Sequence, residues 1–239
     1  MEVNFILQGK GGVGKSLIAS LLAQYFRPQE QPLLCVDTDP VNATFSGYKA
    51  FDVETLNIMD GDDINPRTFD QLIERIMTAE AGRMIIDNGA STFVPLCSYL
   101  LQNDVASLLK EGGHTVRLHS VITGGQALPD TIEGFASLCR NIGTAPVVVW
   151  LNEYFGKPVH NGKTFEESKV YEKNKARIHS LVTIPAVKPE TFGQDMHKML
   201  TRRVTFDEAD ASPDFTIMER QRLRMMKRTL FTNMGKAHL

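Results

Sequence analysis

The chain has 239 residues, of which 42% are hydrophobic and 23% are charged, and its formal net charge is -2. This length and composition are typical of one large globular domain that buries a sizeable core without disulfides. The slightly acidic balance argues mildly against DNA as the main partner, because a dedicated nucleic-acid binder usually carries a basic excess.

Short apolar runs alternate with helical patterns along the sequence. Near-continuous apolar runs predict strands buried on both faces of a sheet, at residues 3–8, 33–37, 83–87, 116–123, 147–151 and 178–184. Helical spacing and stop signals predict helices over 16–26, from Asn65 and Pro66 onward, and over 129–141. The alternation predicts a single α/β domain over 1–239, with a doubly wound, mostly parallel sheet and helices on both faces.

Two later segments have a different composition. Residues 153–175 are polar and rich in Gly, Lys and Glu, which predicts an excursion from the domain and not a second domain. Residues 214–230 predict a basic amphipathic helix, in which Leu223, Met226 and Leu230 share one face. Such a helix can lie on an anionic membrane, dock on a partner, or pack its apolar stripe on its own sheet with its charges in water.

The three cysteines, Cys35, Cys97 and Cys139, lie far apart and form no CxxC pair. We therefore expect buried thiols and no structural metal or iron–sulfur site. No run reaches the roughly 20 apolar residues that a membrane-spanning helix needs, and the first residues show no signal-peptide pattern. These absences favour a cytoplasmic protein.

The string GKGGVGKS, between the first predicted strand and the first predicted helix, matches the motif G-x-x-x-x-G-K-[ST]. Its glycines let backbone N–H groups turn toward phosphate oxygens, and the start of the helix adds the positive end of its dipole. Lys15 can neutralise the β- and γ-phosphates, and the Ser16 hydroxyl can ligate Mg²⁺. The motif predicts a P-loop NTPase domain that binds ATP with Mg²⁺. The predicted nucleotide-binding residues of the loop are Gly9, Gly11, Gly12, Val13, Gly14, Lys15 and Ser16.

Three aspartates lie at strand ends, on the sheet edge where open α/β sheets bind ligands. Asp37 and Asp39 share a face if the segment is extended, so both can approach one metal–phosphate centre; a solvated turn is the alternative for Asp39. Asp87 ends the third predicted strand and fits the pattern of a Walker B aspartate, which holds Mg²⁺. Asn88 and Gly89 then predict a flexible turn that can sense the γ-phosphate.

The phosphate loop carries a second lysine, Lys10, and so resembles the deviant Walker A loop, KGGxGK[ST], of the ParA/MinD family of ATPases. In that family the extra lysine reaches the phosphates bound by a partner subunit when two monomers close face to face around ATP. The resemblance implies an ATP-dependent homodimer with Lys10 in a catalytic role. It also implies, from the D-x-D-P string, that Asp39 orients the attacking water and that Asp37 supports the Mg²⁺ hydration shell. By the same resemblance Asn152 pairs with adenine; a polar residue that opens a loop is the alternative.

Longer strings, among them LQGKGGVGKS, DTDPVNATFSGYKA and TIMERQRLRMMKR, resemble a family of plasmid conjugative transfer proteins through nearly the whole chain. This resemblance implies an NTP-binding protein accessory to conjugation. Our leading hypothesis is a switch in which ATP closes a dimer, slow hydrolysis opens it, and a protein of the transfer machinery reads the state, with peripheral contact at the inner membrane as a further option. The alternatives are a DNA-partition ATPase whose ATP-bound dimer coats DNA, and a small-molecule kinase or ligase, for which the sequence offers no substrate residues.

Overall fold

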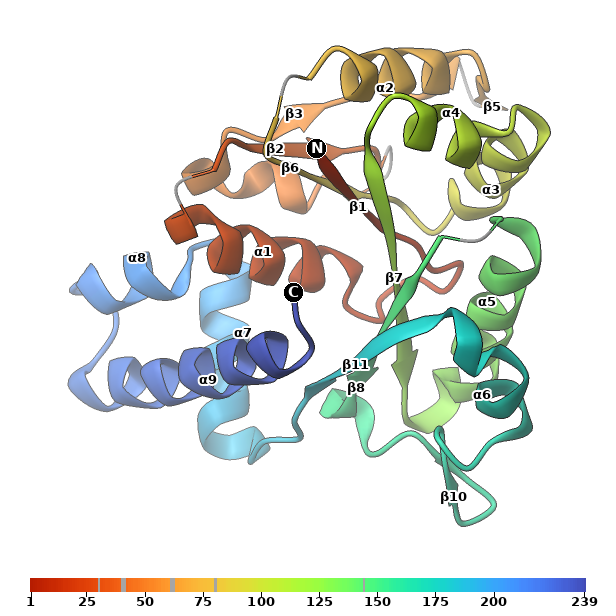
Figure 1. The fold of residues 1–239 in the computed structure, drawn as a ribbon. Helices are drawn as coiled ribbons and strands as arrows, with labels where there is room; N and C mark the ends of the chain where they lie inside the picture. The colour runs from red at the N-terminus through yellow and green to blue at the C-terminus, as the bar shows by residue number, and fades with distance from the viewer. Residues whose placement is uncertain (30, 40–41, 61–62, 80, 144) are drawn as a thin grey trace.

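The computed structural model describes residues 1–29, 31–39, 42–60, 63–79, 81–143 and 145–239. Within them, parallel strands form a 7-stranded sheet in the order β11-β8-β7-β1-β6-β2-β3 (Figure 1). Its strands are β1 (Glu2–Ile6), β2 (Leu33–Asp37), β3 (Glu54–Thr55), β6 (Arg83–Asp87), β7 (Thr115–Thr123), β8 (Val147–Asn152) and β11 (Ile178–Ile184). The predicted doubly wound parallel sheet is confirmed. Because β2, β3 and β6 lie on one side of β1 and the later strands on the other, the carboxyl end of β1 is the topological switch point.

Every predicted strand is present, and β2, β6 and β11 have the predicted bounds. Strand β1 ends two residues earlier than expected, because the chain leaves the sheet there for the glycine-rich loop. Leu7 still donates its N–H to the carbonyl of His119 over 2.8 Å, so the loop starts from a fixed point. The short strands were not predicted, since two residues are too few to show a period. They are β3 at the sheet edge, the hairpin of β4 (Met59–Asp60) and β5 (Asp63–Ile64), and the hairpin of β9 and β10 described below.

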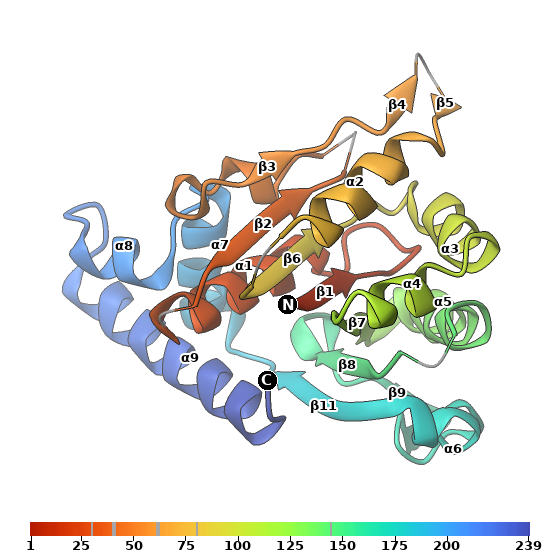
Figure 2. The ribbon, with the colours of Figure 1, turned by 45° about the horizontal axis from the view of Figure 1, so that its top comes forward.

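Helices cover both faces of the sheet (Figures 1 and 2). One face carries α1 (Lys15–Phe26), α7 (Gln194–Thr201), α8 (Phe206–Ala211) and α9 (Ile217–Lys236). The other carries α2 (Thr68–Met77), α3 (Phe93–Gln102), α4 (Val105–Glu111), α5 (Leu128–Asn141) and α6 (Lys169–Asn174). The predicted helices correspond to α1, α2 and α5. Helix α2 starts at Thr68, two residues after the Pro66 that was expected to open it.

The inner strands contribute side chains to the hydrophobic cores on both faces of the sheet. In β8, Val147 and Val149 face the core under α3 and α5, whereas Val148 and Trp150 face the core under α1 and α9. Side chains of a strand alternate between the two faces of its sheet, so a strand buried on both faces needs an apolar residue at every position. This is the physical reason why the apolar runs of the sequence are continuous.

The segment 153–175 folds as a hairpin followed by a short helix. Strands β9 (Val159–His160) and β10 (Lys163–Thr164) pair antiparallel across Asn161 and Gly162, and α6 follows. Phe165 anchors the segment: its ring is 2% exposed and packs edge-on against Phe135 and Tyr171, at centroid distances of 5.5 and 5.6 Å.

Helix α9 runs from Ile217 to Lys236, so it starts and ends later than the predicted 214–230. A capping box of Thr216 and Glu219 sets its first turn. Its apolar side chains are packed into the core that α1 shares with the sheet. They are Leu223, Met226, Leu230 and Met234.

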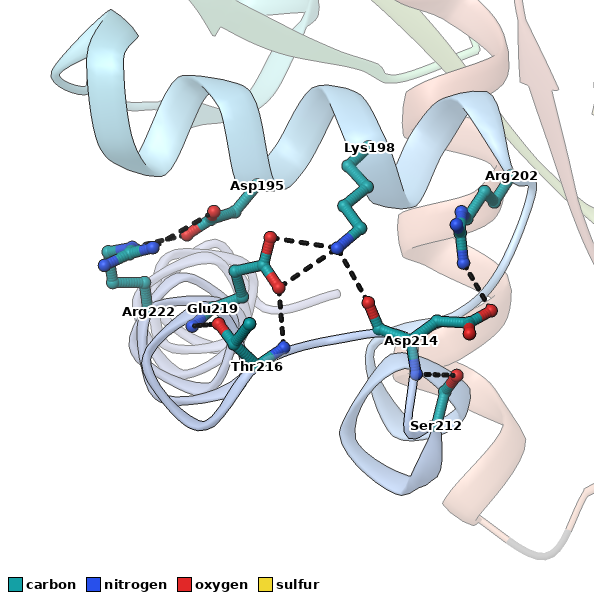
Figure 3. Close-up of polar contacts among 8 residues, drawn as sticks. All are labelled: Asp195, Lys198, Arg202, Ser212, Asp214, Thr216, Glu219 and Arg222. Atoms are coloured by element: carbon teal, nitrogen blue, oxygen red, sulfur yellow. Dashed lines mark hydrogen bonds and ion pairs between the residues drawn. The ribbon is translucent and has the colours of Figure 1, made fainter.

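The basic side chains of α9 are largely paired with acids of the neighbouring helices. Arg222 binds Asp195 of α7, and Lys227 binds Asp207 of α8 over 2.5 Å. Lys198 of α7 reaches both the Glu219 carboxylate and the Asp214 carbonyl, at 2.9 and 2.8 Å (Figure 3). Of the roles left open for this helix, the structure shows packing on its own sheet. No helix of the described segments is long and apolar enough to cross a bilayer.

Candidate nucleotide-binding site

The glycine-rich loop connects β1 to α1 at the switch point of the sheet. Gly12 has φ +74° and Gly14 has φ +104°, values that side chains of other residues rarely adopt. A Cβ atom on Gly9 would lie 3.0 Å from the Phe93 ring at the start of α3, so glycine is also needed for close packing there. The loop borders a cavity of about 630 Å³, lined by Lys15, Ser16 and Asp39 among others. This volume is typical of a small-molecule site.

Lys15 is the most buried cation of the loop. Its side chain is 8% exposed, and its Nζ donates to the Lys10 carbonyl over 3.1 Å. Burial lowers the pKa of Lys15, while Asp87 and Asp39 counteract that effect. The Lys15 ammonium therefore lies in the cavity wall, within electrostatic reach of Asp87 and Asp39, with donor capacity left for an anion.

The buried aspartates of β2 and β6 lie side by side, because Asp37 and Asp87 are register partners at the ends of neighbouring strands. The Asp37 carboxylate is fully buried and satisfied by two backbone donors, Asp39 at 3.0 Å and Ser46 at 2.8 Å. Burial raises the pKa of Asp37 despite these hydrogen bonds. Asp37 thus shapes the loop after β2 as well as adding negative charge.

Asp87 is 1% exposed, and in the described part of the chain neither carboxylate oxygen accepts a well-aligned hydrogen bond, although the Ser16 hydroxyl lies close enough to interact with it. Burial raises the pKa of Asp87 to about 7; Ser16 counteracts part of the shift, Asp37 adds to it, and Lys15 opposes it. An unpaired buried carboxylate is costly, and a hard divalent cation offsets that cost. These residues therefore fit Mg²⁺: Asp87 and Ser16 would hold the ion, and Asp37 lies next to Asp87 on the neighbouring strand.

Asp39 is partly buried and lines the cavity. Its Oδ1 accepts the Asn42 N–H over 2.9 Å, and a Cβ atom on Gly89 would lie 2.8 Å from its carboxyl carbon. The loops after β2 and β6 are therefore in close contact at Asp39. Pro40, the last residue of the D-x-D-P string, lies outside the described residues.

Asn88 does not form the flexible turn that the sequence predicted. Its side chain is 1% exposed and donates to the carbonyls of Ile6 and Ile86, both at 3.2 Å. It also accepts from the Thr38 hydroxyl over 2.9 Å. Asn88 therefore ties the ends of β1, β2 and β6 together, so any flexible turn after β6 has to begin at Gly89 or later.

Lys10 points away from the loop toward α5. Its Nζ lies 2.7 Å from Asp130 Oδ2, and the two side chains are 44% and 56% exposed. Asp130 was not predicted as a site residue, although a Leu-Pro-Asp string at a helix start is a recognisable signal for an acid in the first turn.

Asn152 ends β8 directly behind the loop. Its Nδ2 donates to the Val13 carbonyl over 2.9 Å, and its Oδ1 accepts the Tyr154 N–H over 3.1 Å. The side chain is 3% exposed. Both ends of this amide thus hold backbone groups in place, and its contact with adenine stays a prediction.

The chain belongs to the CobQ/CobB/MinD/ParA nucleotide-binding domain family, whose model matches residues 5–212. This confirms the resemblance to ParA/MinD proteins noted from the loop. At the level of individual proteins, it is similar to two relatives from Escherichia coli, each named Protein TraL. They are 54% and 53% identical to it over 237 residues, which cover 99% of this chain and 98% of each relative.

Solved structures show the same fold at low identity. The MinD cell division protein of Aquifex aeolicus is 14% identical, with 97% of this chain and 98% of that chain covered and a TM-score of 0.51. The septum site-determining protein MinD of Pyrococcus horikoshii, complexed with Mg-ADP, is 13% identical over 99% of both chains, also with a TM-score of 0.51. These likenesses support the predicted P-loop NTPase fold.

Proposed function

We propose that this chain is an Mg²⁺-dependent ATPase that acts as a nucleotide-driven dimerisation switch in plasmid conjugative transfer. The observation that carries the proposal is Asp87, a buried carboxylate that accepts no well-aligned hydrogen bond among the described residues and interacts with the Ser16 hydroxyl and Lys15 of a phosphate loop. An acid with a raised pKa beside a buried cation is typical of a functional site. The bound Mg-ADP of the Pyrococcus MinD protein supports the same ligand class here.

In this proposal each residue of the site has its own role in binding or hydrolysis of the nucleotide. Lys15 balances the charge of the β- and γ-phosphates, and the loop amides hold the phosphate oxygens. Bound Mg²⁺ supplies further charge neutralisation, with Ser16 and Asp87 to hold it. Asp39 lines the same cavity and orients water for attack on the γ-phosphate.

Lys10 is the residue through which two copies communicate. Its ammonium is 44% exposed and is held by a partly exposed acid, so it can exchange Asp130 for another anion at low cost. The phosphates of a nucleotide bound to a second copy are the anion that the family resemblance implies. Closure of the dimer then needs ATP in both copies and Lys10 free of Asp130.

The place of the switch in conjugation rests on the similarity to the two TraL proteins. A transfer-machinery protein that binds one nucleotide state reads the switch, and slow hydrolysis sets how long that state lasts. Light scattering of the purified chain tests the central claim. We expect the mass of a 26.7 kDa monomer without nucleotide or with ADP, and twice that mass with ATP and Mg²⁺.

A control variant and a DNA-binding assay complete this test. Lys15→Ala is expected to stay monomeric in ATP, because it lacks the cation for the phosphates. A wild-type mass that ATP does not change would refute the switch. Salt-sensitive binding of duplex DNA by the ATP-bound protein would instead favour the DNA-partition alternative.

A further inference from the structure

A second cavity lies between α5 and the β9–β10 hairpin, on the segment 153–175 that the ATPase site does not use. Its volume is about 680 Å³, which is large enough for several side chains of a ligand. Its apolar lining includes Leu128 and Ile132 of α5 and Val170 of α6. Phe165 closes the inner end and is 2% exposed. We call this cavity the hairpin groove.

The wall of the groove has a defined shape. Asn161 and Gly162 form the two-residue turn of the hairpin with φ +50° and +75°, the conformation that an Asn-Gly turn favours. The edge-on packing of Phe165 fixes the hairpin to the core. A preformed groove of this kind loses little conformational entropy when a ligand binds.

The charges at the rim are unequal. Glu133 is paired with Arg140 over 2.6 Å, and Glu167 accepts the Thr164 N–H over 2.8 Å. Lys163 and Lys169 also line the groove, and they form no ion pair within the residues that the structure describes. The rim thus holds two lysines without ion pairs above an apolar floor, against one glutamate, Glu167, that no cation of the described residues pairs with.

We propose that the hairpin groove binds an acidic, apolar-anchored segment of a partner protein, and that its occupancy controls Lys10. The groove selects an apolar side chain for its floor and carboxylates for Lys163 and Lys169. Duplex DNA matches it less well, because a phosphate backbone offers no apolar side chain for the floor of the groove. A bilayer cannot enter a concave floor.

The link to Lys10 runs through the first turn of α5. Pro129 lines the groove, and the next residue, Asp130, holds Lys10. Gln8, the last residue before the phosphate loop, donates to the Thr131 carbonyl over 3.1 Å, so this turn is attached to the start of the loop. An occupant that shifts the turn therefore acts on the Lys10–Asp130 pair. This second part of the proposal rests on the proposed ATPase function.

The binding test uses a phage-displayed library of random dodecapeptides, selected on the full-length chain. We expect enriched peptides with Asp or Glu near Leu, Ile or Phe. In fluorescence anisotropy their affinity should fall about tenfold for the Lys163→Glu/Lys169→Glu variant. The matched control, Lys110→Glu/Lys173→Glu, carries the same charge change at exposed lysines outside the groove and should bind normally. The groove assignment would be overturned if the enriched peptides are basic. It would also be overturned if they bind the Lys163→Glu/Lys169→Glu variant as tightly as the wild type. Groove-dependent binding of phosphatidylglycerol vesicles or duplex DNA without any acidic peptide would overturn it as well.

The regulatory test measures phosphate release with a selected peptide. We expect the peptide to raise the rate in the wild type, and to have no such effect in Asp130→Asn, which still binds the peptide. An unchanged wild-type rate with peptide bound would refute control of Lys10. A chain that binds the peptide through the groove but hydrolyses no ATP would refute the proposed ATPase function and leave the docking site standing.

Discussion

Asp87 makes the nucleotide-free protein sensitive to pH in a direction that can be worked out from its environment. Burial raises its pKa from an ordinary 3.8 to about 7. The folded state therefore keeps the proton that the unfolded state has lost, and the stabilisation is fully present below pH 3.8. This contribution decreases as pH rises above 3.8 and is fully lost once pH has risen through 7, so part of it is already lost at pH 5. One pKa unit corresponds to about 1.4 kcal/mol, so the total loss is about 4 kcal/mol.

The substitution Asp87→Asn removes this loss, because an amide does not ionise. Its buried amide still lacks partners, which costs about 1–3 kcal/mol at any pH. Relative to the wild type, the free energy of unfolding of Asp87→Asn should then be about 2–3 kcal/mol higher at pH 8 than at pH 5. Only this pH-dependent difference isolates Asp87, since the constant cost of the amide and the titration of all other groups cancel.

Urea unfolding of both proteins at pH 5 and pH 8, without nucleotide or Mg²⁺, measures the difference from the midpoints and slopes. Mg²⁺ with ATP provides a second readout, because ligand binding should stabilise the wild type and not Asp87→Asn. If the stability difference between the two proteins is the same at both pH values, the Asp87 carboxylate is not held protonated by burial. The Mg²⁺ assignment would then lose its main support.

The other predictions concern the loop, its neighbours and α9. Lys15→Ala should abolish ATP binding in calorimetry while the protein stays folded; near-normal affinity would contradict the phosphate-loop assignment. Lys10→Ala should bind ATP but remain monomeric by size-exclusion chromatography, because the bridging cation is gone. Asp39→Ala should hold ATP and accumulate as the dimer, with phosphate release far below the wild-type rate; release at the wild-type rate would remove Asp39 from the mechanism. Leu230→Ala should lower the free energy of unfolding by about 2–5 kcal/mol, because a fully buried side chain leaves a cavity; a neutral result would mean that α9 does not belong to the core.

The sheet was predictable because its signals are local. Continuous apolar runs identify strands buried on both faces, and the GKGGVGKS string identifies the loop between the first of them and its helix. The Asn161–Gly162 turn carried an equally local signal for a hairpin, which the polar composition around it obscured. Helix α8, with 6 residues, is too short to show a clear period, and it depends on its Thr205 capping box and on packing.

The contacts of the site were less predictable because tertiary packing decides them. The pairing of Lys10 with Asp130 joins residues 120 positions apart (130 − 10) and depends on where α5 starts. The amide of Asn152 was expected to meet adenine, which stays a prediction, and the fold adds two contacts with backbone groups that the sequence did not indicate. The basic residues of α9 were expected to meet an anionic membrane, a partner or water, whereas acids of α7 and α8 pair with several of them. Sequence patterns show which residues are charged, and only the fold shows which charges are already paired.

Gln8 connects the phosphate loop to α5. Its Nε2 donates to the Val121 carbonyl of β7 at 2.8 Å and to the Thr131 carbonyl of α5 at 3.1 Å. A Cβ atom on Gly134 would lie 1.8 Å from Gln8 Oε1, so α5 can approach this closely only because that position is glycine. The residue that precedes the loop is thus in close contact with the helix that supplies Asp130. The start of the phosphate loop and the first turns of α5 are therefore in direct contact, and the ion pair of Lys10 with Asp130 joins the same two segments.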